Sequence, residues 1–241
     1  MAARDRLKEF LYRYHRRHGA EGYVLKIDIK GYYPNMSHKY VNEMFSGYMD
    51  EETYQMAKGV LDRLPGEIGY NPGSQIVQIV GITALDKLDH YIKERLRIKY
   101  YIRYMDDFVL ILESKEYLYD CLNEIEKILN SYGMKTSKSK TYIQRVADPL
   151  LFLGFVYRLT KTGKVVILAD PKKIKHERKK ITRMFNLVAK GKLDLWEVDK
   201  HFKAYKASIR YGNSVMLISR LNAWYENLRK GYENEIYHQK V

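Results

Sequence analysis

The stretch from Tyr101 to Leu112, YIRYMDDFVLIL, constrains the fold more than any other part of the chain. Two runs of β-branched, aromatic and aliphatic residues flank a short polar segment, which is typical of a β-hairpin. The polar segment contains two adjacent carboxylates, Asp106 and Asp107. Acidic residues are common at turn corners, because their side chains bond the local backbone. The rest of the sequence must therefore decide whether this pair is structural or functional.

Apolar periodicity predicts further strands and helices around this hairpin. We expect helices over 5–18, from Ser37 or Asn35 to about 48, from Asp50 to about 64, over 75–97 and over about 115–131, and strands over 23–29, before 145 and within 150–168. From Asp170 onward the pattern changes to basic helices. The mixture of hairpins and helices favours an α+β fold over a doubly wound parallel sheet.

The charge balance indicates a polyanionic partner. The 241 residues include 43 Lys and Arg against 29 Asp and Glu, a formal net charge of +14. Nucleic acid is the simplest partner for such a surplus, although an anionic membrane surface would also satisfy it. The 23 tyrosines suit stacking on bases, but tyrosine is also a common core residue.

Cysteine usage and hydropathy indicate the compartment. Cys121 is the single cysteine, so no disulfide framework is possible and a reducing compartment fits. The charged N-terminal segment has no apolar signal-peptide core, and no apolar run approaches the roughly 20 residues of a membrane span. We expect a soluble cytoplasmic protein without a membrane partner.

Asp28 could join the hairpin carboxylates at one site. It closes the strand VLKID, and three adjacent strands would bring all three carboxylates to one sheet edge. Such carboxylates repel one another unless a cation neutralises them, and Mg²⁺ prefers oxygen ligands. Two ions about 4 Å apart would activate a hydroxyl and stabilise the leaving oxygen of a phosphoryl displacement. The alternative for Asp28 is a solvated strand end.

Four ordered motifs resemble reverse transcriptases. KIDIKGYYP and RYMDDFVLI resemble two catalytic segments of that family, MKTSKSKTYI its lysine-bearing loop, and FLGF its primer-grip hairpin. The C-terminal ASIRYGNSVMLISRLNAWY resembles the thumb of bacterial members of the group II intron, retron and diversity-generating kinds. The resemblance runs from about residue 7 almost to the end.

The resemblance implies a polymerase architecture. Residues 23–169 would form an α+β palm, an antiparallel sheet with packed helices that carries the catalytic aspartates. Residues 170–241 would form a helical, basic thumb. Residues 1–22 would be a basic helix or a remnant of the fingers, which are abbreviated or missing. Arg4, Arg6, Arg13, Arg16 and Arg17 are basic, but none of them matches the family's triphosphate clasp.

The resemblance also implies a catalytic centre. Two Mg²⁺ ions, with Mn²⁺ as a substitute, would be bound by Asp28, Asp106 and the backbone carbonyl of Ile29, with Asp107 assisting. Lys140 matches the lysine that approaches the pyrophosphate leaving group, where it would stabilise developing charge. Lys138 is the competing candidate, and a merely solvated lysine is the plain alternative.

Further positions match nucleotide contacts of the family. Tyr33 matches the aromatic gate that selects deoxynucleotides, although packing beside Pro34 would also explain it. Gly73 and Gln78 lie in PGSQIVQ, which corresponds to the family pattern Gln-Gly-x-x-x-Ser-Pro. Glutamine in the last place resembles the diversity-generating class, whereas Val77 replaces the serine that this class keeps.

Primer and template contacts are implied at three places. Tyr104 and Met105 lie in the aspartate hairpin, and Leu153 and Gly154 would hold the primer backbone. The basic helix after residue 170 would face duplex phosphates through Lys172, Lys173, Lys175, Arg178, Lys179 and Lys180. A solvated helix face is the alternative.

The sequence therefore predicts an RNA-directed DNA polymerase. Its partners would be an RNA template, a DNA primer and dNTPs, with an accessory protein or RNA as a further candidate. One rival is a non-catalytic RNA-binding module, such as a maturase-like helper or a scaffold. Another is an untemplated or protein-primed nucleotidyltransferase of a defence system.

Overall fold

A computed structural model describes residues 2–239, with side chains described up to Glu233. The chain forms two compact units, Met1–Asp148 and Pro149–Val241. The first contains α1 (Ala3–His18), β1 (Tyr23–Asp28), α2 (His38–Tyr48), α3 (Glu51–Leu61), α4 (Gln75–Thr83), α5 (Asp86–His90), the π-helical η1 (Tyr91–Arg95), β2 (Tyr100–Tyr104), β3 (Asp107–Leu112), α6 (Lys115–Ser131) and β4 (Tyr142–Arg145). The second contains β5 (Leu150–Phe152), β6 (Phe155–Leu159), β7 (Val165–Ala169), α7 (Pro171–Ala189), α8 (Leu195–Ser208) and α9 (Val215–Gln239). Antiparallel sheets combined with helices agree with the predicted α+β class.

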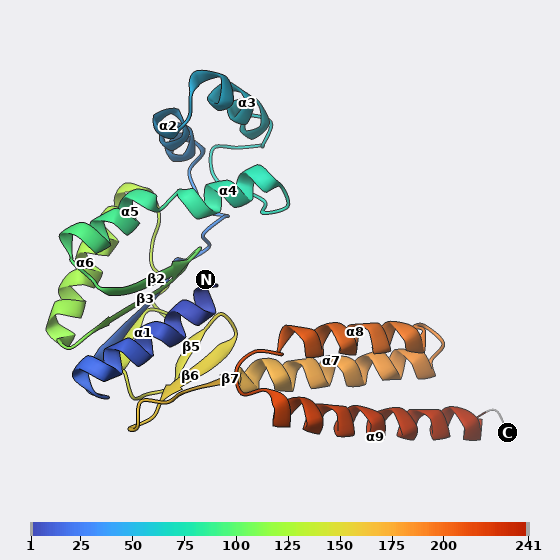
Figure 1. The fold of residues 1–241 in the computed structure, drawn as a ribbon. Coiled ribbons are helices and arrows are strands. Elements are labelled where there is room, and N and C mark those ends of the chain that lie inside the picture. Colours follow the sequence, from blue (N-terminus) through green and yellow to red (C-terminus); the bar gives the residue numbers. More distant parts are fainter. Residues whose placement is uncertain (1, 240–241) are drawn as a thin grey trace. The chain divides into compact units, whose positions relative to one another are not determined.

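The first unit is built on a four-stranded antiparallel sheet of order β2-β3-β1-β4. Successive side chains of a strand point to opposite faces. Tyr100 therefore packs against α1 on one face, while Tyr101 reaches Asp89 of α5 on the other. With α1 on one side of the sheet and α5 and α6 on the other (Figure 1), the inner positions of β1 and β3 are buried in unbroken runs. Both faces of this sheet are core.

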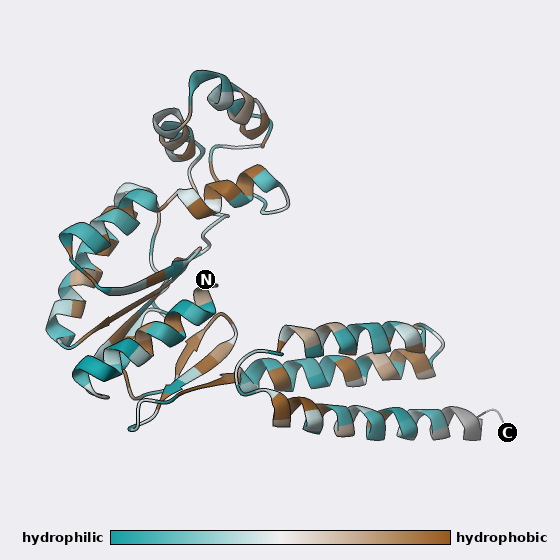
Figure 2. Cartoon of the chain, in the orientation of Figure 1, coloured by the Kyte–Doolittle hydropathy of each residue, from teal (hydrophilic) through white to brown (hydrophobic). Residues whose placement is uncertain are grey.

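Hydropathy follows the same arrangement. The strands of this sheet are largely hydrophobic in Figure 2, whereas α1 mixes hydrophobic and hydrophilic positions. Only Leu7, Leu11 and Tyr14 of α1 are buried, at the spacing of one helix face. Among residues 2–239, no helix is both long and apolar enough to cross a membrane.

Two predicted helix starts are confirmed by their caps. The Ser37 hydroxyl accepts a hydrogen bond from the Tyr40 N–H, and the Asp50 carboxylate accepts one from the Thr53 N–H. Each bond satisfies a backbone donor that the first helical turn leaves without a partner. Asn35, the alternative cap for α2, instead donates to the Lys30 carbonyl.

The prediction of one long helix over 75–97 was wrong, because the helix that begins at Gln75 ends at Thr83. Leu85 leaves helical geometry, with φ −112° and ψ 14°, and α5 and η1 follow as separate segments. Distant side chains bond the carbonyls at the break. Tyr32, Arg103 and Tyr40 donate to the carbonyls of Gly81, Ile82 and Ala84, respectively. These donors supply the bonds that a continuous helix would have made itself.

The second unit joins a small sheet to three helices. β5, β6 and β7 form an antiparallel meander, and Phe185, Phe202 and Tyr225 form an aromatic cluster between the helices. Asn213 extends the edge of β7, since its N–H donates to the Ile167 carbonyl and its side chain accepts from the Ile167 N–H. The change to basic helices near residue 170 coincides with the start of α7, while the division into units lies earlier.

The buried thiol of Cys121 gives a test of this core. Burial raises its pKa to about 11, so the thiol stays protonated and shielded at about pH 8. We expect a thiol-reactive disulfide reagent to label the native chain at least ~100-fold more slowly than the chain unfolded in guanidinium chloride. Rapid labelling of the native chain would contradict the core packing of α6.

Candidate active site

Three carboxylates meet at one edge of the sheet in the first unit. Asp28 ends β1 and lies opposite Asp107, the first residue of β3. Asp106 precedes it in the turn, and its carbonyl accepts a hydrogen bond from the Ile29 N–H at 3.1 Å. The expected meeting of these strands is therefore confirmed. The functional roles of the three side chains stay a prediction.

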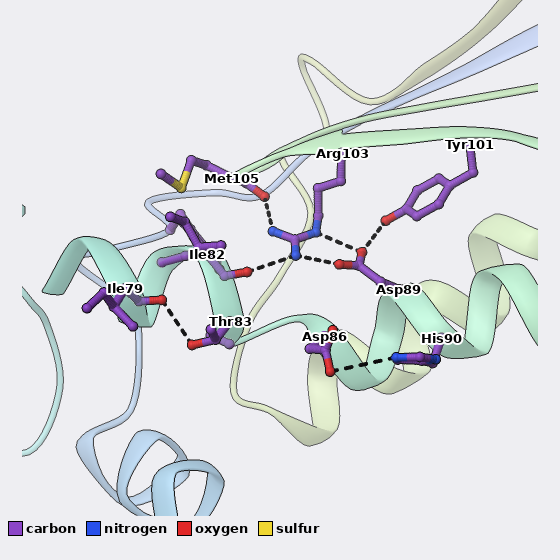
Figure 3. A network of polar contacts seen from close by, with 12 residues as sticks. Ile79, Ile82, Thr83, Asp86, Asp89, His90, Tyr101, Arg103 and Met105 are labelled. Carbon is purple, nitrogen blue, oxygen red and sulfur yellow. Dashed lines mark hydrogen bonds and ion pairs between the residues drawn. The ribbon is translucent and has the colours of Figure 1, made fainter. Parts of the chain in front are cut away.

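The hairpin turn between β2 and β3 is strained and braced. Tyr104 pairs with Asp107, so the loop has only two residues, and Met105 adopts a φ of +54°. Non-glycine residues adopt such angles at a cost of about 1 kcal/mol or more. Arg103 Nη1 donates to the Met105 carbonyl at 3.2 Å and thereby holds the turn in place (Figure 3).

Asp89 of α5 fixes the orientation of Arg103. Its carboxylate accepts hydrogen bonds from Arg103 Nε at 2.8 Å, from Arg103 Nη2 at 2.5 Å and from the Tyr101 hydroxyl at 2.5 Å (Figure 3). Arg103 Nη2 also donates a second hydrogen bond, to the Ile82 carbonyl at 3.0 Å, near the end of α4. The Arg103 side chain is 9% exposed, so a satisfied and largely buried ion pair connects the hairpin to two helices.

Burial and mutual repulsion raise the pKa values of the hairpin carboxyls. For Asp106 the main cause is burial, and the charge of Asp28 adds to it. For Asp107 burial raises the pKa to about 6, partly offset by the adjacent ammonium of Lys26. Lys26 forms an ion pair with Asp107, and Lys140 Nζ lies 3.2 Å from an oxygen of Asp28. Two lysines therefore offset part of the negative charge at this edge of the sheet.

The donor set suits a hard divalent cation. Among the described residues, no group of three or more His, Cys, Asp or Glu side chains is arranged to hold a metal ion. However, Asp28 already attracts Lys140 as a cation, and the buried Ile29 carbonyl accepts no hydrogen bond within the described part of the chain. Carboxylate and carbonyl oxygens are the ligands that Mg²⁺ prefers, so the residues fit the ion.

Tyr33 lies between the hairpin and α4. Its hydroxyl contacts the sulfur of Met105 at 3.7 Å. Burial and the charge of Asp106 raise the pKa of Tyr33, so the phenol stays neutral. On its other side, a Cβ at Gly81 would lie 2.1 Å from the Tyr33 hydroxyl oxygen. The absence of a side chain at Gly81 therefore allows the ring of Tyr33 to occupy this place.

Gly73 and Gln78 lie at the start of α4. The Gly73 N–H donates to the Asn71 side chain at 3.3 Å, and the Gln78 side chain donates to the Pro72 carbonyl at 3.4 Å. Both residues are exposed. Gln78 precedes Gly81 by three residues and so lies on a neighbouring part of the same helix face. Half-exposed Tyr104 lies beside the carboxylates, through its pairing with Asp107.

The second unit brings together the remaining predicted contacts. Leu153 and Gly154 form the two-residue turn between β5 and β6, with φ values of +47° and +81°, as in a type I′ turn. Lys173 reaches Gly154, since its Nζ lies 3.1 Å from the place of a Cβ there. The other predicted phosphate contacts on α7 are exposed, namely Lys172, Lys175, Arg178, Lys179 and Lys180.

Three residues of the first unit escaped the sequence interpretation. Lys26 could have been noticed as a cation inside an apolar strand, two positions before Asp28. Gly81 stands inside an apolar helix, where glycine costs about 1 kcal/mol and so indicates a close approach. The ion pair between Arg103 and Asp89 has no local signal, because Asp89 belongs to another element.

A pair of helical glycines tests the packing of Tyr33. Gly81→Ala should destabilise the chain by about 1–3 kcal/mol, because the new methyl group overlaps Tyr33. Gly59→Ala in α3 is the matched control, since nothing lies within 4 Å of its Cβ position. The control should be neutral or stabilise by up to about 1 kcal/mol. Denaturant unfolding measures both, and equal effects would show that Tyr33 does not occupy this place.

Comparisons with known proteins agree with the geometry. The sequence matches the reverse transcriptase (RNA-dependent DNA polymerase) family over residues 3–157. No curated protein matches the sequence. The structure of telomerase from Candida albicans in complex with a TWJ fragment of telomeric RNA is similar in fold, with a TM-score of 0.54 and 16% identity over 69% of this chain and 33% of that one. Apo telomerase from Candida tropicalis, truncated from the C-terminal domain, gives 0.53 and 15% over 69% and 39%.

The present chain thus spans little more than a third of the length of these structural neighbours. At such identities the neighbours establish a shared fold only. The family match covers more than half of the chain and includes β1, the β2–β3 hairpin and all three carboxylates. This chain belongs to the reverse transcriptase family.

Proposed function

We propose that the chain is an RNA-directed DNA polymerase that extends a primer 3′-hydroxyl with dNTPs. The observation that carries this proposal is the register of β1 against β3, which sets Asp28 opposite Asp107 and beside Asp106. Buried carboxylates that repel one another are costly, and a binding site for divalent cations explains their presence. In this proposal residues 23–169 act as the palm and 170–241 as the thumb, and residues 1–22 are a basic helix or a remnant of the fingers.

The catalytic roles follow from the position of each side chain. Asp28, Asp106 and the Ile29 carbonyl would hold two Mg²⁺ ions, and Asp107 would assist from its pair with Lys26. When bound, the ions lower the pKa of the primer hydroxyl and stabilise the charge on the transferred phosphate. Lys140 is 66% exposed, so it is free to move from Asp28 towards a leaving pyrophosphate. Lys138 remains the rival candidate for that role.

Nucleotide selection is assigned to the region between β1 and α4. Tyr33, supported by Gly81 and Met105, would occupy the space of a ribose 2′-hydroxyl. Gly73 and Gln78, at the start of α4, would contact the incoming nucleotide. The glutamine in that place favours the diversity-generating class, whereas Val77 departs from the serine that this class keeps.

The grip on primer and template is assigned to backbone contacts. Leu153 and Gly154 would hold the primer backbone, because the glycine turn beside Lys173 allows close approach. The cations of α7 would bind duplex phosphates, and Tyr104 and Met105 would contact the primer end. Template RNA would be read by base pairing, so the protein requires no sequence-specific contacts.

Primer extension tests the activity. Asp106→Ala should lower the rate of templated DNA synthesis on an RNA template by at least ~100-fold, because a metal ligand is removed. Asp120→Ala is the matched control, since Asp120 is exposed on α6, and it should retain full activity. Chelation of Mg²⁺ should abolish extension, and Mn²⁺ should restore it.

The same assay separates the rival functions. Products that do not follow the template sequence would indicate an untemplated nucleotidyltransferase. No synthesis by the unmodified chain, with RNA still bound, would overturn the polymerase and favour an RNA-binding scaffold or maturase-like module.

Sugar selection gives a second test. Tyr33→Val should lower the ratio of kcat/KM for dNTP over rNTP by at least ~10-fold, because it opens the space of the 2′-hydroxyl. Steady-state incorporation of single nucleotides measures this ratio. Tyr48→Val, at an exposed tyrosine of α2, is the control and should leave the ratio unchanged. An unchanged ratio in Tyr33→Val would reduce this residue to a packing role.

A further inference from the structure

A basic pocket lies at the end of the first sheet that is opposite to the carboxylates. Arg13, Arg16 and Arg17 of α1 and Lys99 before β2 line a pocket of about 440 Å³, with Tyr100 as the remaining lining residue. Within the described part of the chain, no carboxylate lines this pocket. Its electrostatic potential is therefore positive, and the polymerase proposal gives it no role.

The pocket is separate from the candidate active site. Tyr100 pairs with Ile111, whereas Tyr104, four residues further along β2, pairs with Asp107. At a rise of about 3.3 Å per residue, the two ends of the strand lie about 13 Å apart. One phosphate group therefore cannot bind at both places, and the arginines of the pocket cannot form a triphosphate clasp over Asp106.

Three of the four cations have no acidic partner. Arg13 pairs with Glu9, but Arg16, Arg17 and Lys99 form no ion pair with Asp or Glu among the residues that the structure describes. Cations in the last turn of a helix gain about 0.3–1 kcal/mol each from the helix dipole. That gain accounts for charges on α1, whereas Lys99 comes from a different element and its ammonium lies 5.9 Å from the centroid of the Tyr100 ring.

The wall of the pocket is rigid. The rings of Phe10 and Tyr14 pack edge-on against Tyr100, with centroids 5.8 and 5.5 Å away. The Tyr100 hydroxyl donates to the Arg13 carbonyl at 3.4 Å, which fixes the end of α1 on the strand. These contacts hold Tyr100 and the backbone of α1 in place, while the side chains of Arg13, Arg16, Arg17 and Lys99 are exposed to a ligand.

The chemistry of the pocket fits a nucleic-acid backbone. Planar guanidinium groups match the oxygens of a phosphate with paired hydrogen bonds. Tyr12, 50% exposed and one turn before Arg16, offers an aromatic face beside the cations for an unpaired base. Stable insertion into a membrane surface takes apolar side chains besides the charges, whereas the lining here is cationic apart from Tyr100.

We propose that the pocket formed by Arg13, Arg16, Arg17 and Lys99 binds the phosphodiester backbone of an RNA at a second site, away from the carboxylate edge. Such a site would retain a structured RNA on the protein while the primer end occupies the active site. The proposal requires membership of a family that acts on RNA, but it does not require catalysis by this chain.

RNA binding by charge-neutralised variants tests the proposal. Arg16→Gln, Arg17→Gln and Lys99→Gln are combined in one variant of the full chain. The matched control combines Lys39→Gln, Lys87→Gln and Lys127→Gln, three exposed lysines of α2, α5 and α6 in the same unit. Both variants lose three positive charges, so general electrostatic attraction falls equally in the two.

Fluorescence anisotropy with a labelled RNA hairpin measures affinity over a range of salt concentrations. The pocket variant should bind at least ~10-fold more weakly than the control, and the slope of its salt dependence should decrease by about 1 for each phosphate that the protein no longer neutralises. Its rate of extension of a short primer–template should equal that of the control. The pocket variant can lose RNA binding selectively even if the unmodified chain shows no polymerase activity. That result would support this site and overturn only the catalytic proposal.

Equal affinity of the two variants would overturn the second site. Loss of binding to anionic phospholipid vesicles, with RNA affinity unchanged, would also overturn it and indicate a membrane surface. Competition by inorganic triphosphate at micromolar concentration would indicate a free nucleotide instead of a polymer. In the unmodified chain, bound RNA should slow acetylation of Lys99 but not of Lys87, a measurement that does not depend on how the variants fold.

Discussion

The antiparallel register between β1 and β3 is the constraint on which the first unit depends. It places Asp28 directly opposite Asp107, at the edge where the hairpin turn also holds Asp106. Three carboxylates in partly buried positions would repel one another, and Lys26 and Lys140 supply the neutralising charge. This arrangement destabilises the ionised carboxyls, and it is the reason why we propose that added cations bind at this edge.

Arg103 connects this edge to the helices behind it. Its guanidinium holds the strained turn at Met105, the last turn of α4 and the carboxylate of Asp89 at once. Tyr32 and Tyr33, in the segment that follows β1, also contact α4. The Tyr32 hydroxyl donates to the Gly81 carbonyl, and the Tyr33 ring occupies the space where Gly81 has no side chain. The position of α4 relative to the carboxylates is thus determined by side chains from three separate parts of the sequence.

Local patterns explain why much of this was predictable. The hairpin, the caps at Ser37 and Asp50 and the meeting of the carboxylates each follow from neighbouring residues or from strand pairing. The break after Thr83 was not predictable in the same way, because its apolar spacing continues without interruption. The donors Tyr32, Arg103 and Tyr40, which are distant in sequence, supply hydrogen bonds to the carbonyls at the break between α4 and α5. The pairing of Lys26 with Asp107 likewise depends on strand order, which periodicity does not contain.

The place of β1 between β3 and β4 also affects how the chain is synthesised and folded. β1 leaves the ribosome first, but both of its neighbours lie roughly 80 residues or more further along the chain, and closing so long a loop is entropically costly and slow. The β5–β6–β7 meander, in contrast, pairs strands that are adjacent in sequence. During translation the apolar β1 therefore has no strand partner until β3 has emerged, and it gains its second partner only when β4 follows.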